Sequence, residues 1–183
     1  MNDITSRKNK ELIWQTPYDN KKFDGFKQED DHEKPLDEKG KTDCVNLSNW
    51  LKKSYLNFDL VITSNANRAL QTSNLVFEPL NVLIRENSML YLCSYQEIFN
   101  SIKSLDNNIS DVVFVGHEPS MSETMREMVG NTRPDLGNVS KKPYMPCTMT
   151  FIHFNKTNWA EIEQGEGLLE AYVSPSILEK NYE

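Results

Sequence analysis

The chain has 183 residues, of which 38% are hydrophobic and 26% are charged, which is typical of one globular domain with a sizeable core. Its net charge of −7 argues against a general nucleic-acid-binding protein, because a phosphate backbone is bound by clustered lysines and arginines. Cys44, Cys93 and Cys147 are widely spaced and favour reduced thiols in the cytoplasm. No stretch is apolar for long enough to span a membrane, and the N-terminus lacks the apolar core of a signal peptide.

The first third of the chain predicts a strand, a long loop and a helix. Residues 1–10 are polar and should form a loose terminus, and a first strand is predicted at Glu11–Trp14. Gln15–Asp31 is interpreted as a long polar loop, which in a compact domain is usually functional or mobile. Apolar spacing then predicts a helix over Asp37–Ser54. The inner face of this helix should carry Cys44, Val45, Leu47, Trp50 and Leu51.

The next unit places a basic residue at the start of a helix. Leu60–Ile62 predicts a strand buried on both faces, and Ala66–Val76 predicts the helix that follows it. Ser64 or Asn65 is the expected N-cap, so Arg68 lies in the first turn. Backbone N–H groups and a guanidinium at a helix start make an anion site, although a first-turn arginine on its own is most simply a solvated helix residue.

The rest of the chain continues this alternation of strands and helices. We expect a strand at Asn81–Ile84, an apolar turn near the edge of the site at Met89–Leu92 and an amphipathic helix at Tyr95–Ser104. A buried strand at Asp111–Val115 and a second helix at Ser120–Met128 follow. The last predicted segments are a loop at Gly130–Tyr144, an edge strand at Thr148–Phe154 and a last strand at Gly167–Val173. Strands that alternate with helices predict an α/β fold, a three-layer α/β/α sandwich around a mostly parallel sheet.

His117 lies at the carboxyl end of the predicted strand Asp111–Val115, beside Gly116, which lets the backbone approach closely. A lone histidine is more often structural than catalytic, and His153 in the predicted edge strand is given no site role. Ligands of an open α/β sheet bind at the carboxyl ends of its strands. Because Arg68 and His117 both follow such ends, the sequence predicts that they lie on one sheet edge.

The motifs Ser64-x-Ala66-x-Arg68-Ala69-x-Gln71-Thr72 and Val115-Gly116-His117-Glu118-Pro119 resemble those of the histidine phosphatase superfamily, the phosphoglycerate mutase-like proteins. The closer match is the SixA-type phosphohistidine phosphatase branch, whose Asp-x-x-Arg-Pro-Leu-x-x-x-Gly segment is similar to the run from Asp31 to Gly40. Met145-Pro146-Cys147-Thr148 and Tyr172-Val173-Ser174-Pro175 also fit. The resemblance implies one histidine phosphatase-like domain over residues 11–178, with a flexible segment at 1–10 and a tail at 179–183.

The first catalytic motif of this family is missing. Its Arg-His pair, at the end of strand one, corresponds to Gln15 and Thr16. In the family a neutral imidazole attacks phosphorus and becomes a phosphohistidine, while arginines hold the non-bridging oxygens. A threonine would need a base for activation, and loss of an essential nucleophile in other enzymes costs on the order of a million-fold in turnover. His32 lies away from the strand end and is not expected to replace the nucleophile.

The resemblance implies that Arg68 and His117 are the remaining catalytic-site residues and bind phosphate together with Asp31 and Lys34. Lys34 stands where the SixA branch usually has arginine, so a charge persists without the planar fork. The first hypothesis is therefore a SixA-like protein that binds phosphate but is catalytically impaired. The second is an active phosphatase acting on phosphohistidine or a small phosphate monoester, and the third is a non-catalytic partner-binding domain.

The expected partner is a phosphorylated protein or a small phosphate ester, with no nucleic acid and no membrane, and we expect a cytoplasmic monomer. No cofactor is expected, and no metal, because no cluster of His, Cys and Asp has ligand spacing. The three hypotheses differ in one geometric requirement. Convergence of Arg68 and His117 around one anion would favour the first two, and divergence would favour the third.

Overall fold

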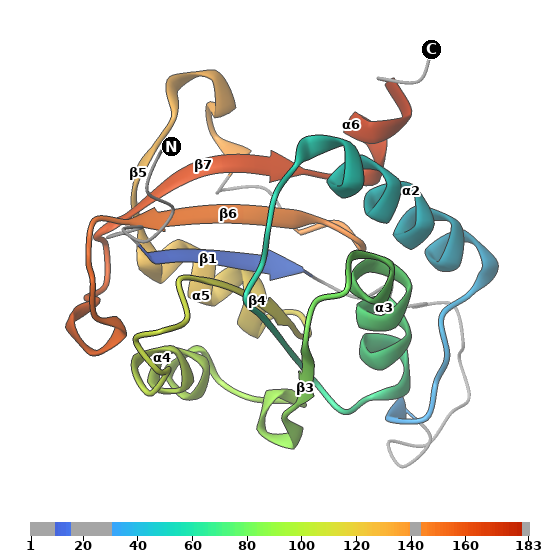
Figure 1. The fold of residues 1–183 in the computed structure, drawn as a ribbon, viewed down its shortest axis with the longest axis horizontal. Coiled ribbons are helices and arrows are strands. Elements are labelled where there is room, and N and C mark those ends of the chain that lie inside the picture. Colours follow the sequence, from blue (N-terminus) through green and yellow to red (C-terminus); the bar gives the residue numbers. More distant parts are fainter. Residues whose placement is uncertain (1–9, 16–30, 140–143, 181–183) are drawn as a thin grey trace, which may run out of the picture.

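The computed structural model describes residues 10–15, 31–139 and 144–180, which form one sheet with helices on both faces (Figure 1). The sheet has seven strands in the order β3-β2-β4-β1-β6-β7-β5. The strands are β1 (Lys10–Gln15), β2 (Leu60–Thr63), β3 (Ile84–Glu86), β4 (Asp111–Val115), β5 (Val129–Thr132), β6 (Met149–Phe154) and β7 (Gly167–Val173). From β3 to β1 the neighbouring strands are parallel, whereas β6 is antiparallel to both β1 and β7. Residues 1–9 and 16–30, where a loose terminus and a long loop were predicted, lie outside the described residues.

The helices are α2 (Glu38–Ser54), α3 (Asn67–Phe77), α4 (Tyr95–Lys103), α5 (Ser120–Met128) and α6 (Pro175–Lys180), and the short 3-10 turns are η1 (Glu78–Leu80), η2 (Ser88–Leu90), η3 (Pro134–Leu136) and η5 (Trp159–Glu161). Polar side chains fix two of the helix starts. The Asp37 carboxylate accepts the Gly40 N–H at the start of α2, and Ser94 and Glu97 form a capping box at the start of α4. Within the described ranges, none of the helices is long and apolar enough to cross a bilayer.

Alternate residues of the central strands divide the core into two layers. On one face, Leu60, Ile62, Val112 and Phe114 pack with buried residues of α4 and α5. On the other face, Val61, Val113 and Val115 pack with buried residues of α2 and α3. Because successive side chains of a strand point to opposite faces, these unbroken apolar runs are buried on both sides. The predicted three-layer sandwich is confirmed, and Figure 1 shows α2 and α3 on one side of the sheet and α4 and α5 on the other.

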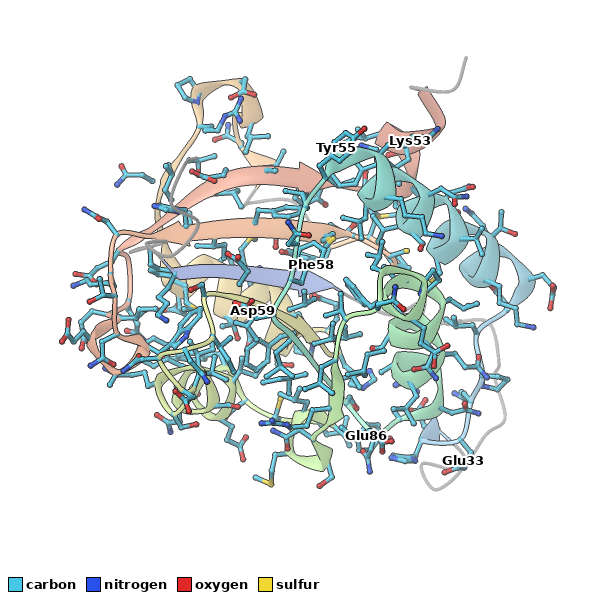
Figure 2. The ribbon with its side chains drawn as sticks, viewed as in Figure 1. Glu33, Lys53, Tyr55, Phe58, Asp59 and Glu86 are labelled. Carbon is cyan, nitrogen blue, oxygen red and sulfur yellow. The ribbon has the colours of Figure 1, made fainter. Side chains whose placement is uncertain are left out.

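The connection from α2 to β2 sets the register of the central strands (Figure 2). Phe58 packs the edge of its ring against Phe77 of α3, with ring centroids 5.8 Å apart. The Asp59 carboxylate accepts the backbone N–H groups of Ser110 and Asp111 at 2.7 Å and 3.0 Å. These bonds tie the start of β2 to the start of β4, so the carboxyl ends of the two strands finish side by side.

Most predicted elements are confirmed, and α5 and β7 have the predicted bounds. Four details are wrong. The predicted strand at residues 81–84 lies instead at Ile84–Glu86. The predicted loop over residues 130–144 includes most of β5, which pairs with β7. The predicted edge strand, β6, lies inside the sheet between β1 and β7. Val45, predicted on the inner face of α2, is 44% exposed, because the buried face of that helix runs through Cys44, Leu47 and Leu51.

Candidate anion-binding site

Three strands end together at one edge of the sheet. Val115, the last residue of β4, lies opposite Thr63 of β2 on one side and opposite Gln15 of β1 on the other. His117 follows Val115 by two residues, and Arg68 lies in the first turn of α3, just after β2. Gln15 therefore occupies the strand end that the sequence predicted, while Thr16 lies outside the described residues.

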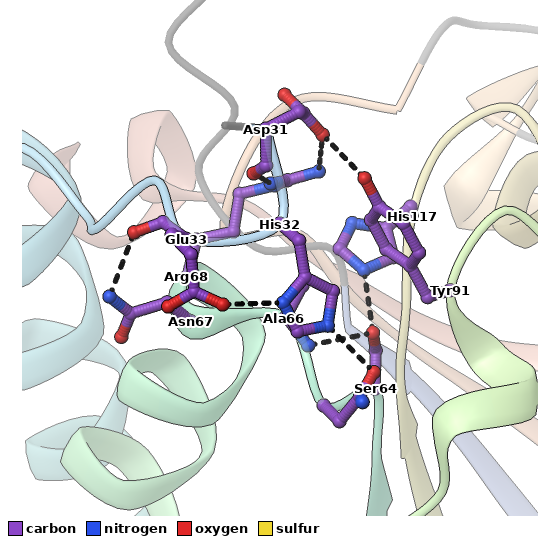
Figure 3. Close-up of polar contacts among 10 residues, drawn as sticks. Asp31, His32, Glu33, Ser64, Ala66, Asn67, Arg68, Tyr91 and His117 are labelled. Carbon is purple, nitrogen blue, oxygen red and sulfur yellow. Dashed lines mark hydrogen bonds and ion pairs between the residues drawn. The ribbon is translucent and has the colours of Figure 1, made fainter. Parts of the chain in front are cut away.

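Arg68 is a buried cation that one residue holds in place. It is 4% exposed, and its Nη1 and Nη2 groups donate to the backbone oxygen and Oδ2 of Asp31 at 2.7 Å and 3.0 Å (Figure 3). Its Nε–H is also buried and has no hydrogen-bond acceptor among the described residues. A cation in the first turn of a helix is unfavourable unless paired, so Asp31 accounts for the charge of Arg68 but leaves one of its donors available.

Asp31 is the centre of a small charged network. Its carboxylate forms an ion pair with Lys34 Nζ at 3.0 Å and one with Arg68, and it accepts the hydroxyl of Tyr91 at 3.1 Å. Burial acts to raise the pKa of Asp31, but hydrogen bonds from Lys34, Tyr91 and Arg68, with the charge of Arg68, lower it below its ordinary value. Asp31 is therefore an anion at neutral pH that orients the cations around it.

Local backbone contacts fix the position of His117. A Cβ on Gly116 would lie 2.8 Å from Met121 Sδ, so the glycine lets α5 begin directly against the strand end. The carbonyl oxygen of His117 accepts both the Ser120 hydroxyl at 2.8 Å and the Met121 N–H at 3.1 Å. His117 is thus held between β4 and the first turn of α5, at 7% exposure.

The imidazole of His117 contacts the loop that follows β2. Its Nε2 lies 2.8 Å from the hydroxyl oxygen of Ser64, which also accepts the backbone N–H of Ala66 at 3.2 Å. When Ser64 donates to Nε2, the other ring nitrogen carries the proton. Burial, and then the charge of Arg68, lowers the pKa of His117 to about 4, so this ring is neutral at pH 7 and can accept or donate one hydrogen bond on each side.

The predicted helix cap in this loop is wrong. The N-cap of α3 is Ala66, without a side-chain cap hydrogen bond. Ser64 is instead committed to His117, and the Asn65 side-chain oxygen is the partner of His32 Nε2 at 3.0 Å. The start of α3 is capped from another segment, because the Asn67 N–H donates to the carbonyl oxygen of His32 at 2.9 Å.

One aromatic ring that the sequence did not place among the site residues, that of Tyr91, connects the parts of the site (Figure 3). The ring of Tyr91 packs edge-on against His32, with centroids 4.9 Å apart, and against His117, with centroids 5.5 Å apart. Tyr91 directly follows η2 and belongs to the apolar turn that the sequence placed near the site edge. Its hydroxyl reaches Asp31, which no local pattern could reveal.

The structure thus groups four of the six predicted site residues, namely Arg68, His117, Asp31 and Lys34, and it places the backbone of Gln15 on the same edge. His153 lies opposite Glu11, near the amino end of β1, and so belongs to the other end of the sheet. The described residues include no group of three or more His, Cys, Asp or Glu side chains that could hold a metal ion. What the site offers chemically is a guanidinium, an ammonium and a neutral imidazole around one carboxylate.

Comparisons with known proteins agree with this architecture. No family model matches the sequence. The uncharacterized protein MT1313 of Mycobacterium tuberculosis is 25% identical over 148 residues, which cover 79% of this chain and 91% of that protein. The putative phosphohistidine phosphatase SixA from Nakamurella multipartitia superposes with a TM-score of 0.70 at 22% identity, over 91% of this chain and 96% of that chain. The protein histidine phosphatase SixA complexed with tungstate gives a TM-score of 0.72 at 18% identity, over 92% and 99% of the two chains. The fold is therefore the histidine phosphatase fold that the motifs predicted.

Proposed function

We propose that this chain is a SixA-like member of the histidine phosphatase superfamily that binds a phosphoryl group at Arg68 and His117 but has lost efficient covalent catalysis. Its ligand would be a phosphohistidine on a protein or a small phosphate ester. The observation that supports this most directly is the buried Nε–H of Arg68, which has no acceptor among the described residues. Arg68 and His117 both follow the carboxyl ends of parallel strands, and Tyr91, which donates to Asp31 and packs against the His117 ring, connects them.

The electrostatics of the site suit an oxyanion. A buried donor without a partner costs about 1–3 kcal/mol, and an oxyanion that accepts the Arg68 Nε–H would recover this energy. The guanidinium is already oriented by two bonds to Asp31, so binding would not have to order it. His117 is neutral at pH 7, because its pKa is about 4, and it can donate one N–H to the same oxyanion.

Covalent catalysis requires a group that the strand end of β1 lacks. The last residue of β1 is Gln15, opposite Val115, and Thr16 follows it in the sequence. A threonine hydroxyl is a weak nucleophile without an adjacent base, and a glutamine provides neither the charge nor the paired donors of an arginine. The expected result is a site that holds a phosphoryl group without transferring it at a useful rate.

The test compares oxyanion binding with turnover. Tungstate binding is measured by calorimetry on the wild type, on Arg68→Ala and on the control Arg133→Ala, whose side chain is 54% exposed and paired with Asp135. We expect Arg68→Ala to weaken binding by roughly 10- to 100-fold, the worth of a charge-assisted hydrogen bond, and Arg133→Ala to bind as the wild type does. Hydrolysis of p-nitrophenyl phosphate should be absent in the wild type and should appear in Gln15→Arg/Thr16→His.

Each alternative gives a different result in the same assays. A wild type that hydrolyses the aryl phosphate, with activity lost in His117→Ala, would identify an active phosphatase. A wild type that binds no tungstate would identify a partner-binding domain that has lost the phosphate site as well as the nucleophile. Tungstate binding that is equally strong in Arg68→Ala would place the oxyanion elsewhere and would overturn the proposed site.

A further inference from the structure

His32 has an acceptor on each ring nitrogen. Nδ1 lies 2.9 Å from Glu33 Oε1, and Nε2 lies 3.0 Å from the side-chain oxygen of Asn65. A carboxylate oxygen and an amide oxygen accept hydrogen bonds and cannot donate them at neutral pH. With the Asn65 amide oxygen facing Nε2, both ring nitrogens donate, and these contacts are those of an imidazolium. The same two hydrogen bonds, first to Glu33 and then to Asn65, raise the pKa of His32.

The imidazolium is fixed beside the candidate anion-binding site (Figure 3). The carbonyl oxygen of His32 accepts the Asn67 N–H at 2.9 Å, which joins its backbone to the first turn of α3. Its ring packs edge-on against Tyr91, which packs in the same way against His117. His32 is also the residue next to Asp31. Its side chain is 30% exposed, so it lies at the rim of the site, where a ligand from solvent can meet it.

The charges of Arg68, Lys34 and Asp31 do not fully balance a phosphoryl dianion, so a further cation would strengthen its binding. Arg68 and Lys34 bring two positive charges, and Asp31 cancels one of them through its ion pairs. A phosphoryl dianion would then meet one net positive charge from these three residues. The partner of His32, Glu33, has a side chain that is 78% exposed, so its carboxylate is screened by water and can turn away when an anion enters.

We propose that His32 is an oxyanion-binding residue of this site, whose imidazolium supplies the second net positive charge for a phosphoryl dianion. This inference rests on the proposed function. It assigns His32 a binding role and excludes a nucleophilic one, because a ring with both nitrogens protonated has no lone pair to attack phosphorus. The consequence is an affinity that depends on pH, since His32 gains and loses its charge near neutrality.

The experiment measures sulfate binding by calorimetry, because sulfate stays a dianion throughout the range used, at about pH 6 and about pH 8.5. The described groups near His32 that carry charge or can titrate are Asp31, Glu33 and Lys34 on its own segment, Arg68 on α3, Tyr91 after η2 and His117 after β4. Carboxylates, ammonium groups, guanidinium groups and phenols keep their charge state in this range, and His117 stays neutral, because its pKa is about 4. A change in affinity between the two pH values therefore reports on His32.

We expect the wild type to bind sulfate about tenfold more tightly at the lower pH, the effect of one nearby charge. His32→Gln should lose that advantage, and His32→Lys should bind tightly at both pH values, because lysine stays charged. His153→Gln, at the other end of the sheet, should behave as the wild type does. Affinity in His32→Gln equal to the wild type at both pH values, with Arg68→Ala still defective, would overturn the role of His32 and leave the proposed function intact. Absence of sulfate binding in the wild type at both pH values would overturn both.

Discussion

Two buried cations lie at opposite ends of this sheet, and their surroundings differ in one respect. Lys10, at the start of β1, is 2% exposed, and its ammonium donates to the carbonyl oxygens of Asn107 and Ile109 at 2.8 Å and 2.5 Å. It also lies over the ring of Trp159, 5.3 Å from the centroid. Arg68, at the carboxyl edge, is 4% exposed and keeps a buried Nε–H without an acceptor among the described residues.

The difference separates a structural cation, Lys10, from the cation that we propose to bind a ligand, Arg68. The Lys10 ammonium donates to two carbonyl oxygens and contacts the ring of Trp159. A ligand would therefore gain no unpaired donor from it. Burial lowers the pKa of Lys10, and the charges of Asp59, Asp111 and Asp106 oppose that shift. Asp31 orients Arg68, but the Arg68 Nε–H has no acceptor among the described residues. A preorganised donor of this kind can bind an anion. Burial alone therefore does not distinguish these two buried cations, whereas the unfilled donor of Arg68 does.

The largest effect on stability should come from the structural cation. Lys10→Met removes two charge-assisted hydrogen bonds, which should lower the free energy of unfolding by about 4 kcal/mol. The Ile109 carbonyl oxygen keeps a second donor, the Trp159 indole N–H at 2.8 Å. Urea unfolding would measure this loss, with the exposed Lys52→Met as the control, expected within about 0.5 kcal/mol of the wild type. Oxyanion affinity should not change in Lys10→Met. A large change in affinity with unchanged stability would reverse the comparison between Lys10 and Arg68.

The next effect concerns pH at the anion-binding edge. The pKa of His117 is about 4 in the folded chain and about 6.5 in an unfolded one. Between these values the unfolded state binds the proton more readily, so stability should fall as the pH decreases from about 7 to about 4. The contribution of His117 is about 3 kcal/mol. His117→Gln should therefore lose less stability than the wild type on acidification, and His153→Gln should lose as much as the wild type. Identical acid dependence in wild type and His117→Gln would show that His117 does not resist protonation.

The smallest effect should come from the phenol that contacts Asp31. Tyr91→Phe keeps both edge-on ring contacts and removes the hydroxyl that donates to Asp31. We expect the free energy of unfolding to fall by about 1 kcal/mol. Tyr55→Phe, at a side chain that is 90% exposed, is the matched control and should be neutral. Thermal unfolding measures both, and equal melting temperatures for the two variants would mean that Tyr91 does not help to hold the carboxylate.

The sequence predicted the fold class and the main site residues because their determinants are local. Apolar runs such as Leu60–Ile62 can only be buried strands between helices, and the residues that follow such strands must lie at a carboxyl edge. Arg68 and His117 each follow a strand by a few residues, so their shared edge follows from the chain order. The resemblance to the family motifs implied the phosphate chemistry, and it predicts that Gln15 and Thr16 stand in place of the catalytic Arg-His pair.

Other parts could not be predicted because their causes are distant in the sequence. In β5 the strand-favouring Val129 and Thr132 flank Gly130 and Asn131, which are depleted in strands, and this segment pairs as a strand with β7. β6 has an alternating pattern typical of an edge, but the sheet continues on both of its sides. From local sequence Ser64 is expected to cap the helix that follows it. In the structure its hydroxyl lies 2.8 Å from the ring of His117, which is 53 residues away in the sequence.

The sequence by itself determined which chemical groups this protein has at the edge of its sheet and which one it lacks. Residue identity and order along strands and helices carry that information. Only the tertiary structure decided how those groups are placed: that Asp31 holds Arg68, that both ring nitrogens of His32 have hydrogen-bond partners, and that Tyr91 links the two histidines. These properties depend on hydrogen bonds and burial between segments from different parts of the chain, and such contacts exist only after the chain has folded.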